Sequence, residues 1–185
     1  MTCTVLWRGE SIVNLPNKLT LLRIVLVPVC LLLAGYGHYT AAAAVFALAA
    51  ATDTLDGYIA RKKHLITSFG KFADPIADKI LVLSMTIVMS VRGLLPVWLP
   101  VIMVFRELMV DGLRMVAAEQ GQVIAAGWSG KVKTTCQMGL ILWALILGSG
   151  PVTMVLSILV AALTLYSGGE YFWKLRGLFK KDLGM

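Results

Sequence analysis

The 185-residue sequence is poor in charge, because only 15% of its residues are charged whereas 58% are hydrophobic. Soluble domains typically contain about 25% charged and about 45 to 50% apolar residues. The apolar residues recur in runs long enough to cross a hydrocarbon core, which takes about 20 helical residues. This composition argues against an ordinary soluble domain and predicts one all-α integral membrane domain over residues 1–185.

The sequence also lacks clusters of metal-binding or disulfide-forming residues. Its three cysteines, Cys3, Cys30 and Cys136, are widely spaced, with no CxxC pair and no Cys/His group, which indicates neither a zinc site nor a disulfide framework. The net charge of +7 comes without a nucleic-acid motif or an aromatic-interleaved basic patch, so no nucleic acid is expected as a partner. Arg8 and Glu10 interrupt the apolar core that a cleaved signal peptide needs.

Six apolar segments separated by turn-forming or charged residues predict six transmembrane helices. They are expected at residues 19–34, 41–61, 69–91, 98–118, 128–147 and 152–173. A short interfacial segment (1–18) precedes them and a basic tail (174–185) follows. The first, third and fifth connections hold only one basic residue, Arg92, whereas twelve basic residues lie near the helix ends on the other side. The positive-inside rule therefore predicts cytoplasmic termini and a cytoplasmic connection between the second and third helices.

Four aspartates flank that connection: Asp53, Asp56, Asp74 and Asp78. Their i, i+3 and i, i+4 spacings put each pair on one helix face, so two antiparallel helices can present all four at a similar depth. Because one aspartate at a helix centre in the membrane costs roughly 2.5 to 3.5 kcal/mol, four of them require compensating cations. Hard oxygen donors without histidine or cysteine suit divalent ions such as Mg²⁺, Mn²⁺ or Ca²⁺, and two such ions would balance the four charges.

The residues between the two aspartate pairs favour a ligand site over a purely structural network of ion pairs. In the structural alternative, Arg61 and Lys79 would neutralise part of the carboxylate charge and hold the helices together. Gly57 and Ala60, however, leave space for a ligand beside the acids. Arg61 can also donate two hydrogen bonds to a phosphate. This combination predicts a metal-dependent diphosphate site.

The pattern D-x2-D-G-x2-A-R-x8-G-x3-D-x3-D, from Asp53 to Asp78, resembles the signature of the CDP-alcohol phosphotransferases, integral membrane enzymes of phospholipid synthesis. The resemblance implies that Asp53 and Asp74 bridge two ions, Mg²⁺ or Mn²⁺, while Asp56 completes the first site and Asp78 the second. It also implies that Asp78 takes the proton from the attacking hydroxyl. Contacts with CDP-diacylglycerol are implied for Asn17, Thr20, Gly57, Ala60, Arg61 and Thr67.

The same resemblance implies a reaction and a location. An alcohol attacks the β-phosphorus of CDP-diacylglycerol and CMP leaves, at an active site that faces the cytoplasm from the bacterial inner membrane. Membrane lipids surround the protein, and a homodimer is expected.

The acceptor alcohol is predicted from the second half of the sequence. Arg106 and Arg114 interrupt the segment 98–118, and Lys131 and Lys133 begin the next one. Several cations around one cavity predict an acceptor that is itself a phosphate ester. In the structural alternative, Arg106 pairs with Asp111 and the lysines only anchor the helix end. The segments NLPNKLTLLR, FGKFADPIADKIL, FRE and GKVKTTCQ resemble family members that use glycerol 3-phosphate.

Three rival interpretations stay open. The first is an enzyme of the same family that uses inositol phosphate, serine or another alcohol. The second is an intramembrane prenyltransferase, although the aspartate motifs of those enzymes usually lie on separate, distant helices. The third is a divalent-cation transporter, which predicts acids near the midplane and broken helices related by repeats, and the sequence has no such repeat.

Overall fold

The computed structural model describes residues 15–63, 68–120 and 127–182, and every regular element in these ranges is an α-helix. Side chains are described at residues 20–52, 76–120, 127–174 and 176. The helices are α1 (Leu15–Gly35), α2 (Tyr39–Lys63), α3 (Ser68–Val91), α4 (Trp98–Glu119), α5 (Trp128–Leu147) and α6 (Pro151–Asp182). The prediction of an all-helical protein with six helices is therefore confirmed for the described residues.

The largest differences from the predicted segments are at the start of α1 and the end of α6. α1 begins at Leu15, so Asn17 lies in its first turn rather than in a separate interfacial segment. α6 continues to Asp182, whereas residue 173 was the predicted end. Hydropathy falls after residue 173, but the segment KLRGLFKKD contains no proline and several good helix formers, so the helix continues where the apolar sequence stops.

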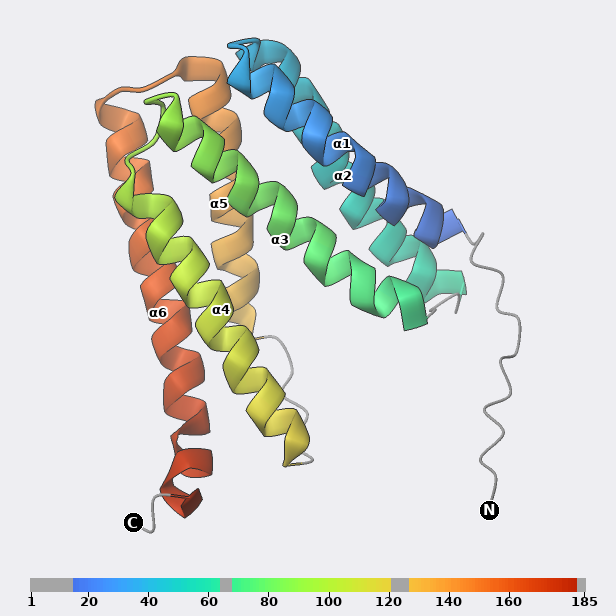
Figure 1. Cartoon of the computed structure of the whole chain (residues 1–185), viewed down its shortest axis with the longest axis vertical. Helices are drawn as coiled ribbons and strands as arrows, with labels where there is room; N and C mark the ends of the chain where they lie inside the picture. Colours follow the sequence, from blue (N-terminus) through green and yellow to red (C-terminus); the bar gives the residue numbers. More distant parts are fainter. Residues whose placement is uncertain (1–14, 64–67, 121–126, 183–185) are drawn as a thin grey trace.

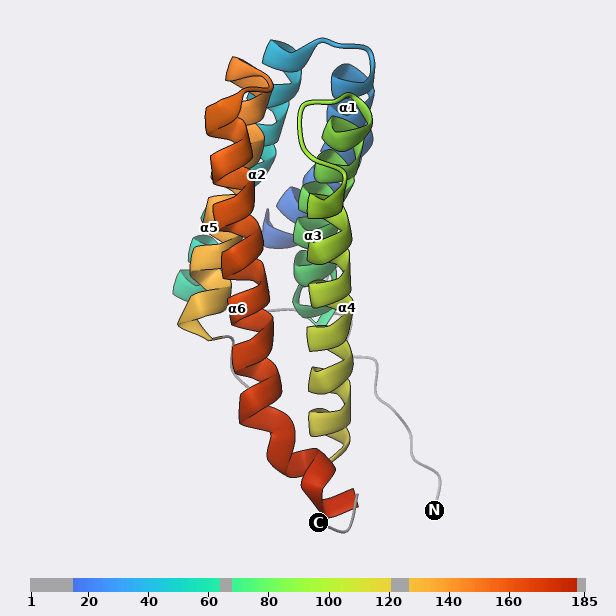
Figure 2. The same ribbon diagram turned by 90° about the vertical axis from the view of Figure 1, so that its left-hand side faces the viewer.

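The helices form two groups that meet at one end of the molecule (Figure 1). α1 packs against α2 and α3, while α6 packs against α4 and α5. Contacts of α5 with α2 and α3, and of α3 with α4, join the two groups. We call the end with the α1/α2, α3/α4 and α5/α6 connections the closed end. At the opposite, open end the groups spread apart, and this end holds the start of α1 and the end of α6 (Figures 1 and 2).

Glycine permits the tight connections at the closed end. Gly93 follows α3 with a φ of 73°, in the left-handed region that other residues rarely adopt. Its N–H donates to the Ser90 carbonyl at 3.1 Å, and the Leu94 N–H donates to the Met89 carbonyl at 2.9 Å. This Schellman motif satisfies carbonyls at the end of the helix. Gly37, with a φ of 86°, ends α1 in the same way.

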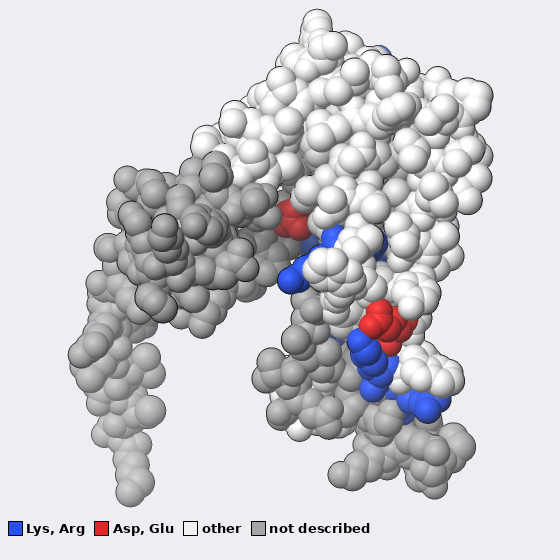
Figure 3. Space-filling view, turned by 180° about the vertical axis from the view of Figure 1, so that it is seen from behind, with Lys and Arg blue, Asp and Glu red and all other residues white. Residues whose placement is uncertain are grey.

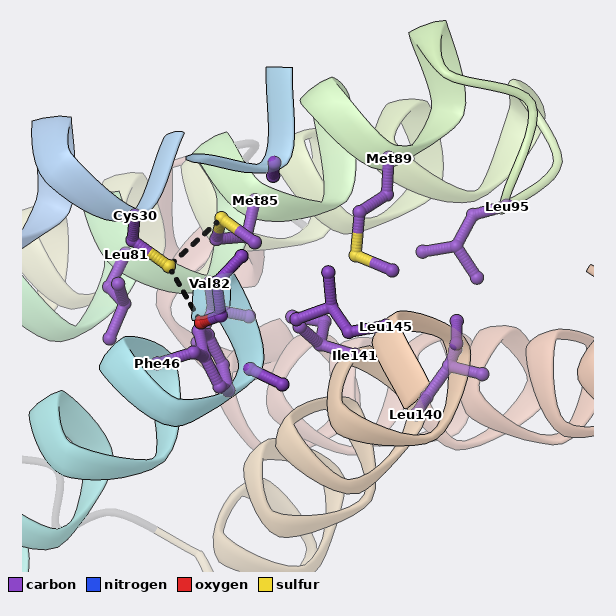
Figure 4. Close-up of a cluster of buried hydrophobic side chains, with 14 of the residues drawn as sticks. Cys30, Phe46, Leu81, Val82, Met85, Met89, Leu95, Leu140, Ile141 and Leu145 are labelled. Carbon is purple, nitrogen blue, oxygen red and sulfur yellow. Dashed lines mark hydrogen bonds between the residues drawn. The ribbon is translucent and has the colours of Figure 1, made fainter. Parts of the chain in front are cut away.

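The main hydrophobic core lies toward the closed end and includes several alanines, which allow close packing of helices. Figure 4 shows larger buried side chains of this core, among them Phe46, Met85 and Met89. Ala42 and Phe46 of α2 pack against Cys30 of α1 and Met85 of α3, and all four are fully buried. The Cys30 thiol lies 3.4 Å from the Ala42 carbonyl oxygen and 3.5 Å from the Met85 sulfur. Because apolar packing occupies this half, the buried charged side chains gather in the other half.

The described helices differ in how well they match an isolated membrane span. Within the described residues, only Pro151–Lys174 is both long and apolar enough to cross a membrane, with a mean hydropathy of 1.8. Thr20–Gly35 and Tyr39–Thr52 are apolar but shorter. α4 is interrupted by charged residues in its second half. Large hydrophobic side chains are nevertheless exposed on several helices, including Leu32, Val101 and Ile158.

Candidate functional site

A cavity of about 430 Å³ opens between α3, α4, α5 and α6. Its wall carries seven charged residues: Asp78, Lys79, Arg106, Glu107, Arg114, Lys131 and Lys133. Figure 3 shows the distribution of charge on one face of the molecule. The surface near the closed end is almost free of charge, and charged side chains appear lower down, toward the open end. We call this space the cationic cavity, since its wall has five basic and two acidic residues.

The cationic cavity brings together five predicted site residues from three helices. Asp78 comes from α3, Arg106 and Arg114 come from α4, and Lys131 and Lys133 come from the first turns of α5. The candidate base and all four candidate phosphate ligands therefore line one space. The arrangement can bind an anion beside a carboxylate.

Glu107 of α4 forms three ion pairs in the wall of the cationic cavity. It is 8% exposed and forms ion pairs with Lys133 of α5, with Arg106 at 3.1 Å and with Lys79 of α3 at 3.7 Å. Because Lys79 also pairs with Asp111, two carboxylates face these three basic side chains, which leaves one positive charge in excess. A buried cation whose charge is not balanced favours a bound anion.

The structural alternative for Arg106, an ion pair with Asp111, is contradicted by the structure. Both Asp111 carboxylate oxygens accept hydrogen bonds from Lys79 at 2.5 Å. Arg106 instead bonds to Glu107 and donates from Nε to Ser167 Oγ of α6 at 3.1 Å. Five helical positions rotate a side chain by about 140°, so residues 106 and 111 point in different directions. Lys79, a candidate partner of the aspartate pairs, forms ion pairs with Glu107 and Asp111 of α4.

Tyr171 of α6 joins the cationic cavity in a way that the sequence did not indicate. Its hydroxyl accepts hydrogen bonds from Arg114 Nη2 and from the Gly127 N–H, both at 2.8 Å. The Arg106 and Arg114 guanidinium carbons lie 5.6 and 5.1 Å from its ring centroid. A tyrosine near the end of an apolar helix is common at membrane interfaces, so its position alone did not distinguish it.

Gly168 makes room for the stem of Arg106. A Cβ atom at position 168 would lie 3.1 Å from Arg106 Cγ and 3.4 Å from Met109 Cε. The neighbouring Gly169 has no such atom within 4 Å. The absence of a side chain at position 168 therefore allows α6 to approach the arginine closely.

The two aspartate pairs lie on helices that run toward and away from the same connection. Asp53 and Asp56 belong to α2, which ends at Lys63, and Asp74 and Asp78 belong to α3, which begins at Ser68. The side chains of Asp53, Asp56 and Asp74 lie outside the described residues, whereas Asp78 lines the cationic cavity. Among the described side chains, no three His, Cys, Asp or Glu residues form a group that could hold a metal.

The chemistry of the four-aspartate set fits hard divalent cations, because all of its donors are carboxylate oxygens. Of the predicted CDP-diacylglycerol contacts, Thr20 is described and is buried in α1. Asn17, Gly57, Ala60 and Arg61 lie in helices at positions whose side chains are not described, and Thr67 lies outside the described residues.

The described part of the chain combines six helices, an aspartate pair on each side of the α2/α3 connection and a cationic cavity that Asp78 lines. The chain belongs to the CDP-alcohol phosphatidyltransferase family, whose model matches residues 13–166. The resemblance predicted from the pattern between Asp53 and Asp78 is therefore confirmed. Membership of this family also argues against the prenyltransferase and transporter interpretations.

Similar proteins come from several bacteria. The chain is 40% identical over 183 residues to the CDP-diacylglycerol--glycerol-3-phosphate 3-phosphatidyltransferase of Bacillus subtilis, with 87% of this chain and 94% of that protein covered. It is 45% identical over 172 residues to a protein of Mycobacterium tuberculosis named probable phosphatidylglycerophosphate synthase, with 86% and 80% covered. An Escherichia coli protein with the same name as the Bacillus protein is 42% identical over 140 residues, with 71% and 76% covered.

Proposed function

We propose that this protein is a phospholipid-biosynthesis enzyme that transfers the phosphatidyl group of CDP-diacylglycerol to glycerol 3-phosphate. The products are phosphatidylglycerophosphate and CMP. Family membership and the similar proteins support the reaction. The observation that carries the choice of acceptor is the cationic cavity, in which arginines and lysines surround the space beside Asp78.

Asp78 would start the reaction by accepting the proton of the acceptor hydroxyl. The oxygen then forms a bond to the β-phosphorus of CDP-diacylglycerol, and the bond from that phosphorus to the CMP oxygen breaks. A carboxylate on the cavity wall can be within reach of a hydroxyl bound there, and general bases typically contribute about 10²- to 10⁴-fold to rate. The position of Asp78 on the wall of the cationic cavity supports its assignment as base for an acceptor bound there.

The acceptor phosphate would bind to Arg106, Arg114, Lys131 and Lys133. Hydrogen bonds from charged donors to phosphate are roughly twice as strong as neutral ones, and an arginine can bind two phosphate oxygens at once. The Glu107 ion pairs hold Arg106 and Lys133 in place before the acceptor arrives. The phosphate of glycerol 3-phosphate would bring negative charge to a wall with five basic and two acidic residues, whereas serine has no net charge, which favours glycerol 3-phosphate over serine.

The four aspartates would hold two divalent cations, Mg²⁺ or Mn²⁺. When bound, such ions neutralise the diphosphate and stabilise the charge that develops on the departing CMP oxygen. Asp53, Asp56, Asp74 and Asp78 would together hold these ions. The all-carboxylate donor set and the position of both pairs beside the α2/α3 connection support this proposal.

The remaining parts of the proposal concern the donor and the membrane. CDP-diacylglycerol would contact residues of α1, α2 and the connection after α2, which are Asn17, Thr20, Gly57, Ala60, Arg61 and Thr67. The six helices would cross the bacterial inner membrane with both termini and the active site on the cytoplasmic side. The position of the start of α1 and the end of α6 at the open end supports this topology (Figure 1). A homodimer is proposed from the family resemblance.

The proposal is tested by measuring CMP release from CDP-diacylglycerol by the purified protein with Mg²⁺ and a panel of acceptors. We expect release with glycerol 3-phosphate and not with serine or inositol phosphate. Asp78→Asn should abolish release while the variant still purifies as a folded protein. Glu119→Gln, an exposed carboxylate on α4, is the matched control and should retain activity. Release with another acceptor only would contradict the acceptor assignment, and substantial turnover by Asp78→Asn would remove Asp78 from the role of base.

A further inference from the structure

Tyr171 connects three elements around the cationic cavity. It belongs to α6 and is 3% exposed. Its hydroxyl accepts one hydrogen bond from Arg114 of α4 and another from the backbone of Gly127, the residue immediately before α5. One phenol oxygen therefore fixes an arginine side chain and the start of the helix that carries Lys131 and Lys133.

Tyr171 contacts Arg114 both through its hydroxyl and through its ring. Arg114 Nη2 donates to the hydroxyl at 2.8 Å, and the guanidinium carbon lies 5.1 Å from the ring centroid, within the range of a cation–π contact. A long arginine side chain loses considerable rotational freedom when it is ordered, so an arginine that is already restrained binds an anion at a lower entropic cost. Tyr171 thus prepares the orientation of the guanidinium group.

Arg114 also has a hydrogen-bond donor that the protein leaves open. Its Nε is buried and has no hydrogen-bond partner among the described residues. A buried donor without a partner is unfavourable, and an anion bound in the cationic cavity can accept its hydrogen bond. The restrained side chain therefore lacks one partner on the wall of a cavity whose charge suits phosphate.

α6 repeats this arrangement one turn earlier. Ser167 and Tyr171 are four residues apart, which places them on the same face of the helix. Ser167 accepts a hydrogen bond from Arg106, and Tyr171 accepts one from Arg114. Neither residue needs to touch the acceptor in order to act, because each restrains an arginine that lines the cavity.

We propose that Tyr171 is a positioning residue that orients Arg114 for the phosphate of the acceptor. This inference rests on the proposed function, because it assigns the cationic cavity to a phosphate ester. Tyr171 acts through Arg114 and not on the reacting atoms. Its hydroxyl therefore affects how tightly the acceptor is bound and leaves the transfer step and the binding of CDP-diacylglycerol unchanged.

The test is Tyr171→Phe, which keeps the ring and removes the hydroxyl. We expect the KM for glycerol 3-phosphate to rise about tenfold, as for the loss of one hydrogen bond to a charged group. The kcat and the KM for CDP-diacylglycerol should stay at their wild-type values. The inhibition constant of inorganic phosphate, measured as a competitive inhibitor against glycerol 3-phosphate, should rise by a similar factor. Tyr166→Phe is the matched control, since Tyr166 lies on the same helix and is 69% exposed, and it should change none of these values.

A second pair of variants separates positioning from general damage. In an Arg114→Gln background, where the guanidinium group is absent, Tyr171→Phe should add little to the KM. If Tyr171→Phe does not fold, Arg114→Lys is compared instead: it keeps the charge but loses the planar group, and its KM for glycerol 3-phosphate should also rise.

Three results would overturn the inference: an unchanged KM for glycerol 3-phosphate in Tyr171→Phe, a fall in kcat with no change in that KM, or a wild-type KM in Arg114→Lys. A wild-type enzyme that releases no CMP with glycerol 3-phosphate would instead refute the proposed function, so the two failures are distinguishable.

Discussion

Arg106 is a charged side chain that is only 6% exposed, at the contact between α4 and α6. Burial of a guanidinium group is tolerated when its donors are bonded to partners and its charge is balanced. Glu107 supplies the balancing charge, and Ser167 accepts from Nε. Gly168 lets the aliphatic stem pass close to the α6 backbone. The direction in which this arginine points is therefore set mainly by small residues on a different helix.

A single methyl group at position 168 should disturb this arrangement. We expect Gly168→Ala to displace the Arg106 stem, because its Cβ would lie 3.1 Å from Arg106 Cγ. The KM for glycerol 3-phosphate should rise by about fivefold or more, an effect of about 1 kcal/mol or more on binding. Steady-state kinetics with purified protein measures this change.

Gly169→Ala provides the comparison for that substitution. It introduces the same methyl group one position along the same helix, where no atom outside the local backbone lies within 4 Å. Its kinetic constants should match the wild type. Equal effects of the two alanines would show that α6 responds to the loss of glycine in general and not to contact with Arg106.

At the scale of elements, Glu107 links three helices through side chains of opposite charge. Lys79 belongs to α3, Glu107 and Arg106 to α4, and Lys133 to α5. Lys79 also holds Asp111, so α3 and α4 share a second ion pair. Removal of one partner from a buried ion pair is strongly destabilising because the other charge is left uncompensated. The Glu107 carboxylate should therefore contribute to stability as well as to the charge of the cavity.

Glu107→Gln tests this contribution. We expect the free energy of unfolding to fall by about 2 to 4 kcal/mol, close to the range for a broken buried pair. Thermal unfolding in detergent measures the loss as a lower midpoint. Glu119→Gln on the same helix is the control, because Glu119 is exposed and belongs to no ion pair with the described residues. A midpoint unchanged in both variants would contradict a stabilising role for Glu107.

Helix positions were predictable from the sequence, but most side-chain partners were not. The segment 128–147 was predicted with the same ends as α5, because tryptophan, glycine and apolar runs mark its ends. The pair between Lys79 and Asp111 joins residues from different helices, and no local spacing reveals it. Tyr171 was missed for the same reason, since its role depends on Arg114 in another helix.

The residues of the candidate site were predictable from the sequence, but the contacts between their side chains were only partly so. Asp78 and Arg106 are predictable as site residues because charge is rare in an apolar chain, and charged residues in membrane helices are usually functional. This prediction does not depend on knowing the fold. The proximity of these residues to α6 does depend on it, and α6 shows no unusual charge between Pro151 and Gly169.

The whole molecule separates apolar packing from charge along its length. The closed end holds tight glycine turns and much of the hydrophobic core, and the open end holds the charged side chains of the cationic cavity (Figures 1 and 3). In a membrane this polarity suits a protein whose open end meets water on one side. The connections at the two ends should therefore face opposite compartments.

Single cysteines at the two ends test the proposed topology. In a background in which Cys3 and Cys136 are replaced by serine, Ser149→Cys places a thiol in the α5/α6 connection and Glu119→Cys places one at the end of α4. Both positions are exposed. A membrane-impermeant maleimide should label Ser149→Cys in intact spheroplasts and Glu119→Cys only after permeabilisation. The reverse pattern would invert the proposed orientation.

Cys30 can remain in that background because its thiol is fully buried among α1, α2 and α3. A reagent dissolved in water reaches such a group only when the surrounding helices separate, so its rate of modification reports local opening of the bundle. The rate of Cys30 alkylation, compared with the faster rate at an engineered exposed cysteine, would therefore measure how often the helices at the closed end separate. Because close packing protects the thiol, Cys30 can serve as a natural probe of helix separation in this part of the protein.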